Sequence, residues 1–154
     1  MKIIIGSSPR AAGRSDFERV GSALARVVRR WRPSRAVVEV NLVGERRMAF
    51  LNRKYRGRRG PTAILTFPYS SGAPFRCAEG PVGEIYLCWP RIVRGAGVAG
   101  VSTRAYLLRL FVHGLVHLRG YRHDSRADEA RMEAVERELL RPLLSRRALG
   151  RLFP

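Results

Sequence analysis

The sequence predicts an α/β fold of the α+β kind, with one small mixed sheet packed against helices. Short apolar runs, some alternating with polar residues, predict strands, whereas apolar residues spaced three or four apart predict amphipathic helices. The two kinds of segment are interleaved along 154 residues, of which 45% are apolar. That length and composition are sufficient for one hydrophobic core. Since no repeat or linker interrupts the chain, we expect a single domain over residues 1–154.

Strands and helices alternate through the first half of the chain. Strands are predicted over residues 1–5, 36–43 and 62–67. Helices are predicted over residues 15–31 and 45–55, the second with one apolar face made by Met48, Leu51 and Tyr55. Gly57 and the following Gly-Pro pair should end the second helix and open a basic loop.

The second half of the chain is richer in predicted helix. Residues 69–81 hold Gly, Ser and Pro and are expected to form a loop, and residues 84–89 should form a strand antiparallel to its predecessor. A strongly apolar helix is predicted over residues 103–119. Its core-facing residues should be Leu107, Leu110, Phe111, Gly114 and Leu115. A last helix is predicted over residues 126–147, which Pro142 should kink or shorten.

Positive charge is the compositional feature that points to a partner. Thirty Lys and Arg against twelve Asp and Glu give a net charge of +18, and all the basic residues except Lys2 and Lys54 are arginine. The planar guanidinium binds phosphate oxygens in pairs, so a nucleic acid is the expected partner. A GC-rich genome would explain the preference for Arg over Lys, but not the surplus of charge. Contacts with RNA are expected from Arg53, Arg58 and Arg59, in and beside the basic loop.

Neither a membrane span nor a secreted disulfide protein is expected. No run of about 18 apolar residues is present, and the first apolar run is too short for the core of a signal peptide. We therefore expect a cytoplasmic protein with no membrane partner. Cys77 and Cys88 fit neither a zinc ribbon nor a redox pair, and they are expected to be small, partly buried residues.

All three histidines of the chain lie in one segment, HGLVHLRGYRHD, residues 113–124. His113 and His117 are four residues apart, so their rings should project from one face of the central helix. Gly120 can adopt the left-handed conformation that ends a helix, which lets the following turn bring His123 towards them. Three imidazoles with one open position are typical of a catalytic zinc site, where bound water has a pKa of about 7. The segment therefore predicts one zinc ion per chain, on the central helix and following turn; the alternative is histidines that only hydrogen-bond around a turn.

The histidine spacing is also that of the metzincin proteases. Those enzymes carry Glu directly after the first histidine as the general base, whereas here that position is Gly114. A protease needs this base to activate water against an amide. A zinc hydrolase of another substrate, such as a peptide, is therefore a less favoured alternative.

Four blocks of the sequence resemble a known family. HGLVHLRGYRHD is similar to the histidine signature of the YbeY family of bacterial endoribonucleases and rRNA maturation factors. LNRKYRGRRGPTAILTFP, residues 51–68, resembles the family's L-N-x-x-Y-R and P-T-x-V-L-S-F-P blocks, and GEIYLC, residues 83–88, resembles its G-D-I-x-I-C. DEARMEAVERELL, residues 128–140, is similar to the family's closing helix. The blocks stand in the family's order and cover about residues 45–140.

The resemblance implies a zinc-dependent endoribonuclease specific for single strands. It implies action in rRNA maturation, at the 3′ end of 16S rRNA, and in ribosome quality control, with ribosomal RNA and the small ribosomal subunit as partners. It also implies that the three histidines are the zinc ligands and that Arg56 lies in the catalytic cleft, where a guanidinium would stabilise the charge of a phosphodiester transition state. The further alternative is a non-enzymatic RNA-binding factor of ribosome assembly, with zinc holding the last helices together.

Three positions depart from the family pattern. Arg122 stands where the family usually has Asp before the third histidine, Ala63 replaces a residue that is often polar or acidic, and Glu84 stands for Asp. These departures leave all three histidines in place. They bear on the surroundings of the metal and on the fit of the substrate.

Overall fold

The computed structural model describes residues 2–5, 14–28, 35–69, 80–122 and 124–154. Strands and helices are interleaved along these ranges, which confirms the predicted α+β class. In chain order the elements are β1 (Lys2–Ile5), α1 (Arg14–Val28), β2 (Ala36–Val43), α2 (Glu45–Arg56), β3 (Ile64–Pro68), β4 (Gly80–Cys88), α3 (Trp89–Ala99), α4 (Thr103–Leu118), α5 (Arg126–Leu140) and α6 (Arg146–Leu152).

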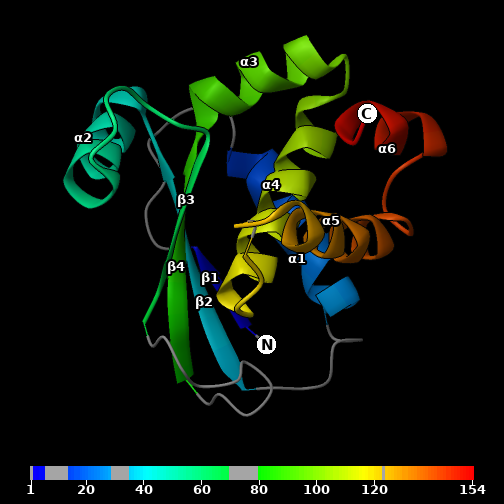
Figure 1. Ribbon diagram of the computed structural model, residues 1–154, viewed down its shortest axis with the longest axis horizontal. Coiled ribbons are helices and arrows are strands. Elements are labelled where there is room, and N and C mark those ends of the chain that lie inside the picture. The colour runs from blue at the N-terminus through cyan, green and yellow to red at the C-terminus, as the bar shows by residue number, and fades with distance from the viewer. Residues whose placement is uncertain (1, 6–13, 29–34, 70–79, 123) are drawn as a thin grey trace.

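The strands form a small mixed sheet in the order β1-β2-β4-β3 (Figure 1). β2 pairs in parallel with β1 and with β4, whereas β3 pairs antiparallel with β4 at the edge of the sheet. Parallel neighbours need a long crossover, and α1 lies in the one between β1 and β2. The predicted mixed sheet and the antiparallel pairing of its last two strands are therefore confirmed.

Helices cover the two faces of the sheet unequally (Figure 1). The large core lies between one face and the helices α1, α4 and α5, whereas α2 packs against the opposite face through Met48 and Leu51. Successive residues of a strand point to opposite faces. Accordingly, Ile64 and Ile85 belong to the core on the α4 side, and Leu65 belongs to the cluster under α2.

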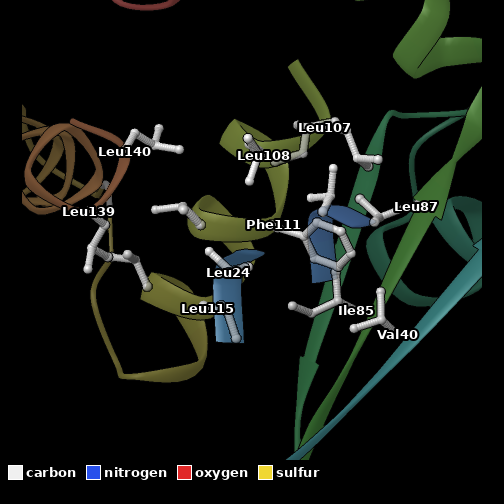
Figure 2. Packing of buried hydrophobic residues seen from close by; sticks show 14 of the residues in the cluster. Leu24, Val40, Ile85, Leu87, Leu107, Leu108, Phe111, Leu115, Leu139 and Leu140 are labelled. Atoms are coloured by element: carbon white, nitrogen blue, oxygen red, sulfur yellow. The ribbon is translucent and has the colours of Figure 1, made fainter. Parts of the chain in front are cut away.

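Helix α4 lies at the centre of the large core. Leu107 and Phe111 lie beside Ile85 and Leu87 of β4, while Leu139 and Leu140 of α5 lie on the other side of the helix (Figure 2). All the residues predicted to face the core from this helix are buried. The helix also lies close to the sheet at Gly114, where an added Cβ would be 2.8 Å from Cδ1 of Ile85.

Three features of the second half of the chain differ from those predicted. β4 begins at Gly80, four residues before the predicted start of this strand at residue 84. Trp89, predicted as the last residue of the strand, begins α3, a helix that the sequence did not predict. The predicted helix over residues 126–147 is divided into α5 and α6. Pro142 lies in the turn between them, as its missing N–H and fixed φ led us to expect.

Tyr55 corrects the predicted apolar face of α2. Met48 and Leu51 are buried, but Tyr55 is 56% exposed. Its ring lies near the end of the helix and packs edge-on against Phe67 of the edge strand β3, with 5.0 Å between ring centroids. Solvent reaches the ring there because no further strand follows β3 in the described sheet.

Some expectations fall on parts of the chain outside the described residues. These are the end of the first helix beyond Val28, most of the loop over residues 69–81, and Cys77. Cys88 is buried as expected, and burial raises the pKa of its thiol. Among the described residues, no helix combines the length and apolarity needed to cross a membrane.

Gly83 tests the close pairing of β3 with β4. A Cβ at this position would lie 2.6 Å from the carbonyl oxygen of Phe67 and 2.6 Å from Cδ2 of Leu118. We expect Gly83→Ala to lower the free energy of unfolding by about 1–3 kcal/mol in urea titrations, because the strand backbone must shift.

The matched control is Gly97→Ala on α3. A Cβ there meets nothing within 4 Å, so the substitution should stabilise the protein by about 0.5–1 kcal/mol through helix propensity alone. Equal unfolding free energies for the two variants would contradict the close approach at Gly83.

Candidate metal centre

The last turns of α4 bring two imidazoles close together in an edge-to-face arrangement. The Nε2 atoms of His113 and His117 lie 3.1 Å apart, and the ring planes are nearly perpendicular at 88°. Both side chains are half-buried at the end of the helix. The four-residue spacing therefore places the two rings as predicted.

The other ring nitrogen of each histidine has a partner that fixes the ring. Nδ1 of His117 lies 3.0 Å from the carbonyl oxygen of Tyr121. A carbonyl only accepts, so this Nδ1 carries the proton and donates it. Nδ1 of His113 lies 2.8 Å from Oε1 of Glu136, and a carboxylate accepts in the same way. In the neutral rings both Nε2 lone pairs then point at one shared region.

Two lone pairs at this separation require a cation between them. A proton or a metal ion can fill that role. Two ligand nitrogens at about 2.0–2.1 Å from a tetrahedral zinc ion would lie about 3.3–3.4 Å apart. The observed 3.1 Å is within a few tenths of an ångström of that separation, so the pair fits two ligands of a zinc ion.

The predicted third ligand, His123, lies outside the described residues. Within the described part of the chain, no group of three His, Cys, Asp or Glu side chains is placed to hold a metal ion. Gly120 has a φ of 89°, the left-handed turn predicted after the helix. Asp124 is exposed, and its Oδ2 lies 3.7 Å from Nη1 of Arg122. The structure thus brings two of the three predicted ligands together and contains the predicted turn after them, and the role of these residues as metal ligands stays a prediction.

Glu136 is the residue of the site that the sequence reasoning missed. Its side chain is only 3% exposed, although it is a carboxylate on α5. The signal that could have found it is its position on the apolar stripe of α5 with Met132 and Leu139, where a buried acid needs a partner. Nδ1 of His113 is that partner, a recurring arrangement around metal-binding imidazoles.

Contacts between α4, α5 and the end of the chain lie close to Glu136. The ring of Phe153 lies 4.8 Å from the guanidinium carbons of both Arg109 and Arg137. Arg137 also donates to the backbone oxygen of Phe153 at 2.6 Å. These cation–π contacts lie next to a small cavity of about 80 Å³, which Arg109, Phe153, Glu136 and His113 line. They join the two helices next to the histidine–glutamate pair.

Arg56 and the other predicted RNA contacts lie at the C-terminal end of α2. Arg53, Arg56, Arg58 and Arg59 are all exposed, and α2 packs on the sheet face opposite to α4. Gly57 ends the helix with a φ of 63°. The following loop leads to Ile64, whose Cδ1 would lie 3.2 Å from a Cβ at Gly114. The basic loop therefore ends beside the helix that carries the histidines, and the role of each arginine stays a prediction.

Glu84 lies on the sheet face away from the histidines. It accepts hydrogen bonds from the hydroxyls of Tyr69 and Tyr86, and it lies opposite Glu39 in the β2–β4 register. The hydrogen bond to Glu84, with desolvation and negative charge, raises the pKa of Tyr69 to about 12 and that of Tyr86 to about 12. Glu84 is therefore engaged by two tyrosines. Ala63, the other departure in this region, packs against the large core.

Comparisons with known proteins agree on one family. A family model described as endoribonuclease YbeY matches residues 14–144. An endoribonuclease YbeY from Aromatoleum aromaticum is 34% identical in an alignment of 129 residues that covers 81% of this chain and 80% of that protein. One from Azoarcus sp. is 38% identical over 122 residues, or 75% of this chain, and the match spans about half of that longer protein, 48%.

A solved structure shows the same fold. The solution structure of TM1509 from Thermotoga maritima superposes with a TM-score of 0.62 at 26% sequence identity. The match covers 91% of this chain and 90% of that one.

The tyrosine pair on Glu84 gives a pH-dependent prediction. We expect two tyrosines to ionise near pH 12, against about 10 for an ordinary tyrosine. Because the folded-state pKa is raised, this contribution to stability is complete below about pH 10 and is lost as the pH rises towards 12. Ultraviolet titration of tyrosinate follows the ionisation, and unfolding at each pH follows the stability.

Glu84→Gln should move both ionisations back towards the ordinary range, since the charged acceptor is gone. Glu39→Gln is the matched control, because Glu39 acts on these tyrosines only through its charge and its removal should have the smaller effect. Identical titrations for wild type and Glu84→Gln would show that the hydrogen bonds are absent in solution.

Proposed function

Because this chain belongs to the endoribonuclease YbeY family, we propose that it is a zinc-dependent endoribonuclease that hydrolyses single-stranded RNA. The observation that carries the proposal is the pair His113 and His117, whose Nε2 atoms converge within the region that matches the family. Converging neutral imidazoles are the ligands that zinc prefers in catalytic sites. The net charge of +18 supports a polyanionic substrate.

The residues of this chain would hold and orient the metal from two sides. His113, His117 and His123 are the proposed ligands. Glu136 and the carbonyl of Tyr121 keep the protons of the two described rings on Nδ1, so that Nε2 is available to the metal. Zinc, when bound, supplies Lewis acidity towards the scissile phosphate.

Arg56 is the proposed catalytic cation. Negative charge gathers on the non-bridging phosphate oxygens in the transition state, and a guanidinium placed there stabilises it. Two observations support this role. Residues 51–68 resemble a sequence block of the family, and the loop after Arg56 leads to β3, which lies beside α4. Arg53, Arg58 and Arg59 would contact neighbouring phosphates without reading the bases.

The proposed substrate is ribosomal RNA of the small ribosomal subunit, in the cytoplasm. We assign the reaction to maturation of the 3′ end of 16S rRNA, with the same cleavage serving ribosome quality control. Incubating the purified, zinc-loaded protein with precursor 16S rRNA should yield cleavage that a chelator abolishes. Intact precursor after incubation with zinc-loaded protein would count against the proposal.

Two alternatives predict different results. A metzincin-like peptidase needs Glu after the first histidine, but that position, Gly114, faces the sheet, where an added Cβ would lie 2.8 Å from Cδ1 of Ile85. A general base at that position would therefore point away from the metal. A non-enzymatic assembly factor would bind the precursor RNA without cleaving it, so the same incubation distinguishes it from an enzyme.

The metal site gives the first prediction on function. Elemental analysis should find about one zinc ion per untagged chain, and His117→Ala should lose it. Glu136→Gln should weaken zinc binding about 10- to 100-fold in competition with a chelating dye, because the outer carboxylate orients His113 and raises its basicity.

Glu138→Gln is the matched control for this substitution. It lies on the same helix but is exposed, and it should bind zinc as wild type does. A wild-type protein without zinc, or equal affinities for Glu136→Gln and Glu138→Gln, would contradict the assigned site.

The second prediction concerns Arg56. Arg56→Ala should lower the rate of RNA cleavage about 100-fold, corresponding to about 3 kcal/mol of transition-state stabilisation, while folding and zinc content stay unchanged. Arg46→Ala removes the same charge from the exposed start of the same helix and should keep most of the rate. A fall of less than about threefold for Arg56→Ala would show a surface charge only.

A further inference from the structure

An open pocket lies beside the histidine pair, between the turn after α4 and the start of α5. Its volume is about 350 Å³, within the range of about 300–1,000 Å³ found for ligand sites. Tyr121, one of its lining residues, accepts the Nδ1 proton of His117 through its backbone oxygen. Tyr121 therefore both lines the pocket and accepts the hydrogen bond that orients His117, a proposed metal ligand.

The lining of the pocket combines guanidinium groups with an aromatic ring. Arg119, Arg122 and Arg131 line it together with Tyr121, whose side chain is 37% exposed. Guanidinium groups bind phosphate in pairs of hydrogen bonds, and an exposed aromatic ring stacks on a nucleobase. This combination is the chemistry of single-stranded nucleic-acid recognition.

Two of the arginines in the pocket form long, solvent-exposed ion pairs with aspartates. Nη1 of Arg122 lies 3.7 Å from Oδ2 of Asp124, and Nη1 of Arg131 lies 3.8 Å from Oδ1 of Asp128. The arginine side chains of both pairs are 77% exposed, so solvent screens these ion pairs and each contributes little to stability. A phosphate that accepts two hydrogen bonds from one guanidinium interacts more strongly with the arginine than either aspartate does at 3.7–3.8 Å.

We propose that this pocket binds one nucleotide of the RNA strand next to the scissile phosphate. Arg122 and Arg131 hold its phosphate, and the base stacks on Tyr121. The site rests on the proposed ribonuclease function, and it adds a contact formed by residues outside the basic loop. RNA bound here is a single strand, because the faces of a base inside a duplex are already stacked on its neighbours and cannot stack on Tyr121.

Salt dependence of RNA binding tests the phosphate contacts. The probe is a short fluorescein-labelled oligouridine, with binding measured by anisotropy between about 50 and 300 mM salt. The double variant Arg122→Gln, Arg131→Gln should flatten the slope of log K against log salt by about 0.7, because one phosphate contact on a single strand is lost. Arg146→Gln, Arg147→Gln removes the same charge from the exposed start of α6 and should leave the slope unchanged.

Tyr121 tests the stacking contact. Tyr121→Ala should weaken binding of the oligouridine roughly tenfold, whereas Tyr121→Phe should retain wild-type affinity, because the ring and not the hydroxyl stacks. Zinc content should not change in either variant, since the acceptor for His117 is the backbone carbonyl. Equal affinities for Tyr121→Ala and wild type would remove the stacking contact from the proposal.

The outcomes separate this pocket from the proposed function. If wild type cleaves precursor RNA and binds oligouridine, but the Arg122, Arg131 variant keeps the full slope, the pocket is overturned and the ribonuclease stands. The same holds if only Arg58→Gln, Arg59→Gln flattens the slope. If wild type binds with the expected dependence on Arg122 and Arg131 but cleaves no RNA, the pocket stands and the ribonuclease is overturned.

Discussion

Burial of α4 is the constraint on which the rest of the site depends. The helix is packed between the sheet and α5, with Phe111 and Leu115 almost fully buried, and the half-buried His113 and His117 share the remaining side of its last turns. Each large buried side chain contributes about 1.5–3 kcal/mol. A rotation of the helix that moved the imidazoles would expose several of these side chains at once. The hydrophobic core therefore sets the direction of the two rings, and Glu136 and the Tyr121 carbonyl set their tautomer.

Local patterns predicted most of the elements, because strands and amphipathic helices are encoded by short spacings. β2 was predicted at its observed bounds, and α4 within a residue. α3 was missed because Gly95 and Gly97 give it a low helix propensity. Tertiary contacts explain it: Ile92 and Ala96 are buried, and a Cβ at Gly95 would lie 2.5 Å from the ring of Tyr106. Such a contact between two helices cannot be inferred from either segment alone.

The candidate site was predictable only where its parts share a helix. The pair His113 and His117 follows from the helical repeat, but the partnership of His113 with Glu136 depends on how α4 and α5 cross. The carbonyl of Tyr121 is a backbone group, for which side-chain identity carries no signal. For the arginines of the basic loop, the sequence predicted which residues lie together but not on which side of the sheet they begin. Their order along the chain indicates a shared loop but not the sheet face of α2, which is opposite to that of α4.

Gly114 has an evolutionary consequence. Sequence spacing alone suggests that one substitution, Gly to Glu after the first histidine, would give the motif of a zinc peptidase. In this fold the position lies against Ile85 and Ile64, so a carboxylate would enter the hydrophobic core unpaired, at a cost of several kcal/mol. A lineage could reach that motif only after the sheet had been remodelled to receive the charge. Packing thus separates this fold from the peptidase motif, although the two differ at a single position in the linear pattern.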